Sequence, residues 1–159
     1  AWGLANAAAT LVGQNLGAGH PDRAERAVWL TGLYDMLFLA VVTVVMELFP
    51  EVIVDAMASG EEVRGHALAT LRICASGYVF YAWGMVAMQA FNGAGDTKTP
   101  TWITVWCMWC LQLPLAYTLG FHTELGPTGV FWSIPISETA FAVVSVILFR
   151  RGRWRDVKV

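Results

Sequence analysis

The chain has 159 residues, of which 57% are hydrophobic and 14% are charged, and its formal net charge is -2. Soluble domains carry about 45–50% apolar and about 25% charged residues, so this balance excludes an ordinary soluble protein and indicates a membrane protein. A net charge this small gives no support to a nucleic-acid partner, and we expect none.

The first residues, 1–12, form an apolar stretch that is too short to cross a bilayer. We expect it to be the end of a helix that starts upstream in a longer protein. Four later stretches each reach the roughly 20 apolar residues that a spanning helix needs. They are residues 27–49, 67–91, 101–121 and 128–149. Because apolar side chains occur all round each stretch, we predict an all-α integral membrane fold with four complete transmembrane helices.

Two of these spans contain a proline. Pro114 lies within residues 101–121, and Pro135 lies within residues 128–149. In a soluble helix each proline would argue for a break. Membrane helices tolerate proline and are often kinked by it, so we expect both spans to continue through these positions.

The basic residues favour one side of the membrane. Eight of the ten Lys and Arg residues lie in alternate connections and in the tail, residues 150–159: Arg23, Arg26, Lys98, Arg150, Arg151, Arg153, Arg155 and Lys158. The other side carries Arg64 and mainly acidic residues: Glu51, Asp55, Glu61, Glu62 and Glu124. The positive-inside rule therefore predicts a multi-pass protein of the cell (plasma) membrane with a cytoplasmic C-terminus.

Two of the four ionisable residues within the spans lie near the acidic side. Glu47 is close to the end of the first span, and Arg72 is roughly 8 Å inside the start of the second. Opposite charges at similar depth on consecutive antiparallel helices predict a structural ion pair. The alternative is that both side chains extend to the lipid headgroups.

The other two ionisable residues lie deeper. Asp35 is roughly 12 Å from the basic end of its span, and Glu138 is at the middle of the last span, three residues after Pro135. A carboxyl group at this depth is costly unless it pairs, faces water, or exchanges a proton. Glu138 and Asp35 are therefore candidates for binding a coupling ion or a substrate. The alternative is a protonated carboxyl that hydrogen-bonds to a neighbouring helix.

Gln112, beside Pro114, is a further candidate for substrate contact, although an interhelical hydrogen bond would equally explain a polar residue there. His20, His66 and His122 all fall in predicted connections, so no hydrolytic triad or Glu-x-x-His motif occurs within the spans, and we expect no enzyme. Cys107 and Cys110 lie in an apolar run without further metal ligands. We expect no metal site and no cofactor.

Two glycine-rich segments lie at the predicted cytoplasmic ends. They are "LVGQNLGAGHPDRAERA", residues 11–27, and "QAFNGAGDTKTPT", residues 89–101. Neither has the Walker A spacing of a phosphate-binding loop. Their glycines favour left-handed helix ends, and Pro21 and Pro100 suit the first turn of a following helix. Both segments are predicted to be tight turns between helices.

Together, these two segments and the four-span layout resemble the multidrug and toxic compound extrusion (MATE) transporters. The resemblance covers nearly the whole chain and implies a twelve-helix fold of two six-helix lobes. Residues 1–12 then resemble the end of the eighth helix, and the four spans resemble the ninth to the twelfth. Residues 1–159 would thus form part of the C-terminal lobe, and the remaining N-terminal lobe would be a partner within the same transporter.

The resemblance also implies antiport, in which H⁺ or Na⁺ enters as a drug or an organic cation leaves. The best-known coupling carboxylates of the family lie in the first, seventh and tenth helices. Tyr81 falls about where sodium-coupled members carry an acid in the tenth, so a sodium site of that kind is not expected here. Two alternatives are a lipid-linked sugar flippase of the same superfamily and a membrane module with only a structural or partner-binding role.

Overall fold

The computed structural model describes residues 1–57 and 60–156, and every regular element within these residues is helical. The end of the predicted basic tail, with Lys158, lies outside the described residues. The elements in chain order are α1 (Trp2–Gly17), α2 (Pro21–Leu48), α3 (Pro50–Asp55), α4 (Glu61–Gly93), α5 (Lys98–Thr104), the π-helix η1 (Val105–Gln112), α6 (Leu113–Phe121), α7 (Pro127–Arg150) and the 3₁₀ turn η2 (Arg153–Asp156).

Four helical segments of the described chain are long and apolar enough to cross a membrane: Pro21–Leu48, Val63–Gly93, Lys98–Phe121 and Pro127–Arg150. The fold class predicted from the sequence is therefore confirmed. The first span begins at Pro21 rather than at Ala27. The missing N–H and fixed φ of proline suit the first turn of a helix, so α2 begins before its apolar run does.

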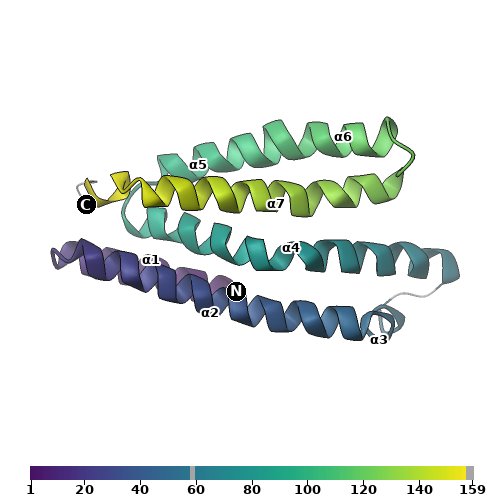
Figure 1. Ribbon diagram of the computed structural model, residues 1–159, viewed down its shortest axis with the longest axis horizontal. Helices are drawn as coiled ribbons and strands as arrows, with labels where there is room; N and C mark the ends of the chain where they lie inside the picture. The colour runs from purple at the N-terminus through teal and green to yellow at the C-terminus, as the bar shows by residue number, and fades with distance from the viewer. Residues whose placement is uncertain (58–59, 157–159) are drawn as a thin grey trace.

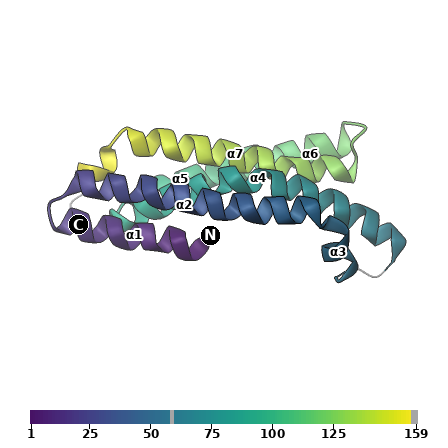
Figure 2. The ribbon, with the colours of Figure 1, turned by 60° about the horizontal axis from the view of Figure 1, so that its bottom comes forward.

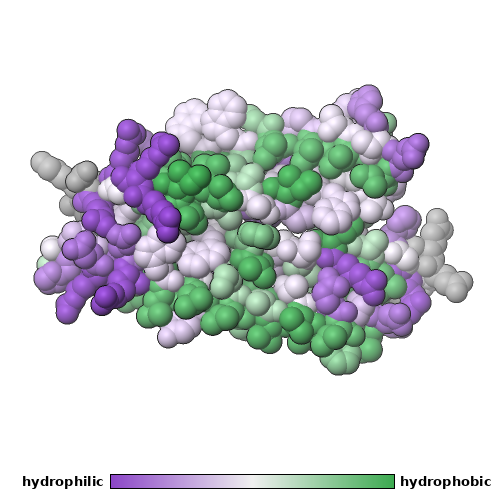
Figure 3. Space-filling view, viewed as in Figure 1, coloured by the Kyte–Doolittle hydropathy of each residue, from purple (hydrophilic) through white to green (hydrophobic). Residues whose placement is uncertain are grey.

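The helices lie side by side along one long axis (Figure 1). The turn from α1 to α2, the turn from α4 to α5 and the described end of the chain lie together at one end, and α3 and the turn from α6 to α7 lie at the other (Figures 1 and 2). Helix α4 occupies the centre of the bundle, because it packs against α1, α2 and α7. Hydrophilic residues gather at both ends of the visible face, and a mainly apolar zone separates them (Figure 3).

Both glycine-rich segments form the predicted turns. Gly19 and Gly95 adopt φ values of 74° and 81°, a left-handed conformation that glycine reaches without strain. Asp96 then stabilises the start of α5, because its carboxylate accepts hydrogen bonds from the Thr99 amide at 3.0 Å and from the Thr99 hydroxyl at 2.5 Å.

Both prolines remain within continuous spans, as predicted. Helix α7 runs through Pro135, while Pro114 is the second residue of α6, whose first residue, Leu113, directly follows η1. Proline lacks an N–H and crowds the carbonyl one turn earlier. A local change to π-helical spacing is one way in which a membrane helix accommodates such a residue.

Glycine allows several helices to approach closely. A Cβ atom on Gly77 would lie 2.9 Å from the Cβ of Pro135, and one on Gly84 would lie 2.6 Å from the Phe141 ring. Gly77 and Gly84 are seven residues apart and therefore lie on one face of α4, which contacts α7. Small residues at such interfaces increase the packing contact between helices in a membrane, where little hydrophobic driving force exists.

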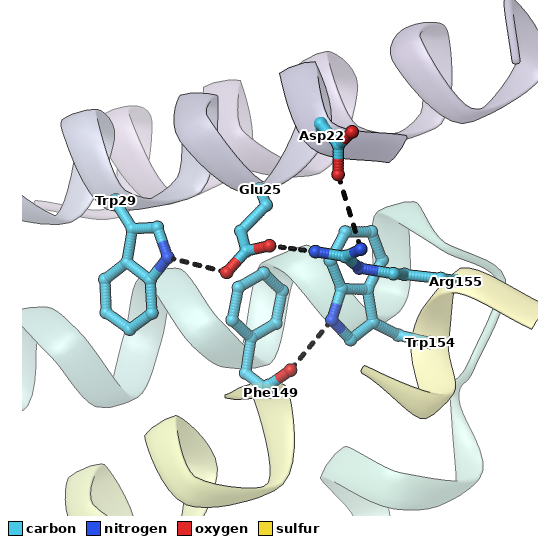
Figure 4. A network of polar contacts seen from close by, with 6 residues as sticks. All are labelled: Asp22, Glu25, Trp29, Phe149, Trp154 and Arg155. Atoms are coloured by element: carbon cyan, nitrogen blue, oxygen red, sulfur yellow. Dashed lines mark hydrogen bonds and ion pairs between the residues drawn. The ribbon is translucent and has the colours of Figure 1, made fainter. Parts of the chain in front are cut away.

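The end of the chain is fastened to α2 by Trp154 and Arg155, here called the C-terminal anchor (Figure 4). The Trp154 indole stacks on the Phe149 ring with centroids 4.8 Å apart, and its Nε1 donates to the Phe149 carbonyl at 2.9 Å. Arg155 forms ion pairs with Asp22, at 3.4 Å, and with Glu25. The anchor thus joins the end of α7 to the first turns of α2.

At the opposite end, Arg64 connects α4 to α3. Its guanidinium donates to both carboxylate oxygens of Asp55, at 2.6 and 3.3 Å, and lies 3.7 Å from Glu51. The hydrogen bond from Arg64 holds the pKa of Asp55 below its ordinary value of 3.8. Both side chains are well exposed, so we expect the contribution of the pair to stability to be small.

The Asp55–Arg64 pair predicts a pH dependence of stability. Because the pKa of Asp55 is lower in the folded protein, the pair stabilises the fold above the ordinary aspartate pKa and loses this effect as the pH falls through the lowered value. Asp55→Asn should therefore lower the melting temperature slightly at about pH 5–7, and the difference from the wild type should vanish in strong acid. Glu124→Gln, at another exposed acid, is the control. A difference that persists in strong acid would contradict the prediction.

Candidate functional site

A cavity of about 480 Å³ lies between α4 and α7 and reaches α2. The close approach of Gly77 to Pro135 brings α4 and α7 together at this level. Eight residues line the cavity: Leu39, Cys74, Gly77, Tyr78, Tyr81, Ile134, Pro135 and Glu138. Glu138 is the only charged residue among them, so the cavity is largely apolar with one acidic group and two phenols.

Glu138 is half-buried in the wall of this cavity. Its Oε2 atom is shielded from solvent and has no hydrogen-bond partner among the described residues. Because Pro135 and Glu138 are three residues apart, both lie on the face of α7 that contacts α4. A buried carboxylate oxygen without a partner is costly, which makes Glu138 a candidate for binding a proton or a cation.

Asp35 is fully buried on α2. Neither of its carboxylate oxygens has a hydrogen-bond partner within the described chain, and the nitrogen of Ala1 lies 3.6 Å from Oδ1. Leu39, one helical turn further along α2, lines the cavity that contains Glu138. Asp35 therefore lies beside the same cavity, on the face of α2 directed toward the centre of the bundle.

Tyr81 is on α4, which packs against both α2, with Asp35, and α7, with Glu138. It lines the cavity with Glu138. A phenol can donate a hydrogen bond to a carboxylate or accept one from a protonated carboxyl. The structure thus gathers two acids from α2 and α7 and one phenol from α4 into a single region that can hold a proton or a small cation.

The other residues singled out from the sequence are not part of this region. Gln112 is half-buried at the end of η1 and does not line the cavity. Glu47 and Arg72 are both exposed, and no ion pair between them occurs in the described structure. At this end of the bundle, Arg64 forms ion pairs with Glu51 and Asp55. The Glu47–Arg72 pair and the substrate role of Gln112 stay predictions.

Tyr78 and Cys74 line the cavity but were not candidates from the sequence. A signal for them does exist. Cys74, Tyr78 and Tyr81 follow each other at intervals of four and three residues, which places them on one face of α4. This spacing alone does not show that the three residues line a cavity. That depends on which face of α4 packs against α7.

Known proteins share this architecture. A solved structure described as the inward-facing conformation of a multidrug resistance MATE family transporter of the MOP superfamily matches with a TM-score of 0.85. The match covers 96% of this chain and 35% of the other, at 22% sequence identity, and it establishes similarity of fold alone.

Curated relatives extend the similarity to the sequence. A probable multidrug resistance protein NorM of Rhodopseudomonas palustris is 30% identical over 94% of this chain and 32% of its own. Another, from Mesorhizobium japonicum, is 31% identical over 97% of this chain and 33% of its own. Protein DETOXIFICATION 15 of Arabidopsis thaliana is 28% identical over 84% and 28% of the two chains.

The chain thus spans about a third of the length of the curated relatives that it matches. The MatE family model matches residues 1–118, which is well over half of the 159 residues. The chain therefore belongs to the MatE family, and the resemblance found in its sequence motifs is confirmed.

Proposed function

We propose that this chain forms part of the C-terminal lobe of a multidrug efflux transporter, which exports drugs or organic cations in exchange for H⁺ or Na⁺. The names of its relatives in Rhodopseudomonas and Mesorhizobium support a role in drug resistance. The share of their length that the chain covers supports a missing second lobe as its partner. The basic end supports a cytoplasmic C-terminus in a plasma membrane.

The observation that carries this proposal is the position of Glu138. Its carboxyl group lies in the wall of a largely apolar cavity, with one oxygen lacking any described partner. An ionised Glu138 attracts an organic cation or Na⁺, whereas a protonated one leaves the cavity neutral. Ion and cargo then compete for one carboxylate, and this competition couples their opposite movements across the membrane.

Asp35 and Tyr81 extend this arrangement. Asp35 is fully buried beside the cavity, and Tyr81 lines the cavity together with Glu138. When one carboxyl is ionised, the other holds its proton more readily, because two negative charges in an apolar region repel each other. We propose that the pair shares one proton or one cation, with the Tyr81 hydroxyl as an additional oxygen ligand.

The lining of the cavity favours a cationic cargo over a lipid-linked sugar. A lipid-linked sugar carries phosphate groups, which require Lys or Arg partners. Among the eight residues that line the cavity, none is basic and one is acidic. The flippase alternative therefore receives no support from this cavity.

Glu138→Gln tests the proposal in the full-length transporter, reconstituted in proteoliposomes with ethidium as the organic cation. Efflux driven by an imposed pH or sodium gradient should fall by about tenfold, which lies within the usual range of coupling between two ligands. Glu138→Asp should retain part of it. Comparing the two gradients identifies the coupling ion.

Glu47→Gln is the matched control, because Glu47 is another carboxylate of a spanning helix but is exposed and distant from the cavity. Its efflux should match that of the wild type. Undiminished efflux in a well-folded Glu138→Gln protein would remove Glu138 from the mechanism. A loss confined to Asp35→Asn would then move coupling to Asp35. Absence of efflux in the wild type would favour a structural module.

A further inference from the structure

A second cavity, of about 420 Å³, lies at the basic end of the bundle between α5, η1 and α7. It is distant from Glu138, and no lining residue is shared between the two cavities. Lys98, Arg151 and Arg153 contribute to its lining at the mouth, next to the turns that end the membrane spans. Trp102, Trp106 and Leu148 are among the residues that form its wall.

The three basic residues of this cavity carry uncompensated charge. None of them forms an ion pair with any side chain that the structure describes, whereas Arg64 and Arg155 each pair with two acids. The one acid in the lining, Asp96, accepts hydrogen bonds from the amide and hydroxyl of Thr99 and can offset only one of the three positive charges. The cavity mouth therefore has a surplus of positive charge that attracts an anion.

The wall of the cavity is apolar and continues into the membrane zone. Trp102 and Trp106 are four residues apart on one face of the span, and both are 63% exposed. Val144 and Leu148 on α7 repeat this spacing opposite them. From Lys98 to Trp106 the wall extends roughly 12 Å along the helix axis. In Figure 3, hydrophilic surface at the C-terminal end of α7 borders directly on apolar surface.

We propose that this cavity binds one anionic phospholipid. Its phosphate group contacts Lys98, Arg151 and Arg153, and the start of an acyl chain lies along Trp102, Trp106 and Leu148. A free phosphate would leave the apolar wall unused, and a zwitterionic lipid would leave positive charge uncompensated. Basic pockets between helices at the cytoplasmic face suit anionic headgroups, and tryptophan is typical of this interface.

The bound lipid would have a defined structural effect. Lys98 begins α5, whereas Arg151 and Arg153 follow the end of α7. A phosphate group that contacts all three residues connects the start of α5 to the end of α7. Side-chain packing is the other contact between these two helices. The site thus fixes the start of the third span relative to the end of the fourth.

The test is native mass spectrometry of the delipidated full-length transporter titrated with phosphatidylglycerol. The double variant Lys98→Gln/Arg151→Gln should weaken binding by about 25-fold, because each basic residue near an anionic headgroup contributes about fivefold. Arg23→Gln/Arg26→Gln is the matched control, since it removes two charges at the same end but outside the cavity. Its affinity should stay within about twofold of the wild type.

Three further measurements make the test specific. Trp106→Ala should also weaken binding of phosphatidylglycerol, while phosphatidylcholine should bind poorly and inorganic phosphate should not displace the lipid. Equal losses in the two double variants would overturn the proposal in favour of unspecific attraction. Displacement by phosphate would overturn it in favour of a soluble anion. Binding is measured without cargo or gradient, so its failure would leave the proposed role of Glu138 untouched.

Discussion

Trp154→Ala is expected to destabilise the full-length protein by about 3–5 kcal/mol, the usual range for truncating a buried aromatic residue to alanine. The Trp154 side chain is 1% exposed, and its ring is parallel to that of Phe149 within 6°. The substitution removes this stack and the hydrogen bond to the Phe149 carbonyl. It also removes the ring beside Arg155, whose guanidinium lies 5.5 Å from the ring centroid. Thermal unfolding in detergent measures the loss.

Two other variants define the cause of this loss. Trp154→Phe keeps an aromatic ring but lacks the N–H donor, so it should cost only about 0.5–1.5 kcal/mol. Trp109→Ala is the matched control, because Trp109 is 66% exposed, and its effect should stay within about 0.5 kcal/mol. If Trp154→Ala unfolded at the same temperature as Trp109→Ala, the C-terminal anchor would contribute nothing to stability.

Gly93→Ala is expected to separate α1 from α4. A Cβ atom at Gly93 would lie 2.2 Å from the carbonyl oxygen of Ala9 and 2.7 Å from its Cα. Both are backbone atoms, so the clash is relieved only by moving one helix. The separation also strains the hydrogen bond from Gln89 to Asn6, which joins the same two helices. Overpacking of this kind costs typically about 1–3 kcal/mol.

Gly65→Ala is the control for Gly93→Ala, because it makes the same chemical change on the same helix. Nothing lies within 4 Å of a Cβ atom at Gly65. Alanine favours a helix over glycine by about 1 kcal/mol, so Gly65→Ala should leave the melting temperature unchanged or raise it. The two substitutions are thus expected to differ in sign. A stable Gly93→Ala protein would show that the contact between α1 and α4 adjusts without cost.

The C-terminal anchor and the contact between α1 and α4 both act at the basic end of the bundle. The anchor joins α7 to α2, and Gly93 brings α4 against α1. Together they hold the ends of four helices in one arrangement. The cavity with Glu138 lies further along these helices.

The depth of each residue in the membrane could be predicted from the sequence. The length of the apolar runs, about 20 residues each, located the four spans, and the positions of Lys and Arg distinguished the two ends. The two glycine-rich segments could be predicted to be turns, because glycine and proline suit helix ends and helix starts, and with the four-span layout they carried the resemblance to the family. These features depend on residues that are near each other in the chain, so a single sequence contains them.

The rotation of each helix about its axis was decided only by tertiary packing. Glu47 and Arg72 have similar depth, but both side chains are exposed and the described structure does not pair them. Glu138 and Tyr81 line one cavity where Gly77 and Pro135 bring α4 and α7 together, and Asp35 is buried on α2 beside it. Which face meets which neighbour depends on contacts between residues far apart in the chain. Because apolar side chains surround every span, the sequence alone carries little information about that choice.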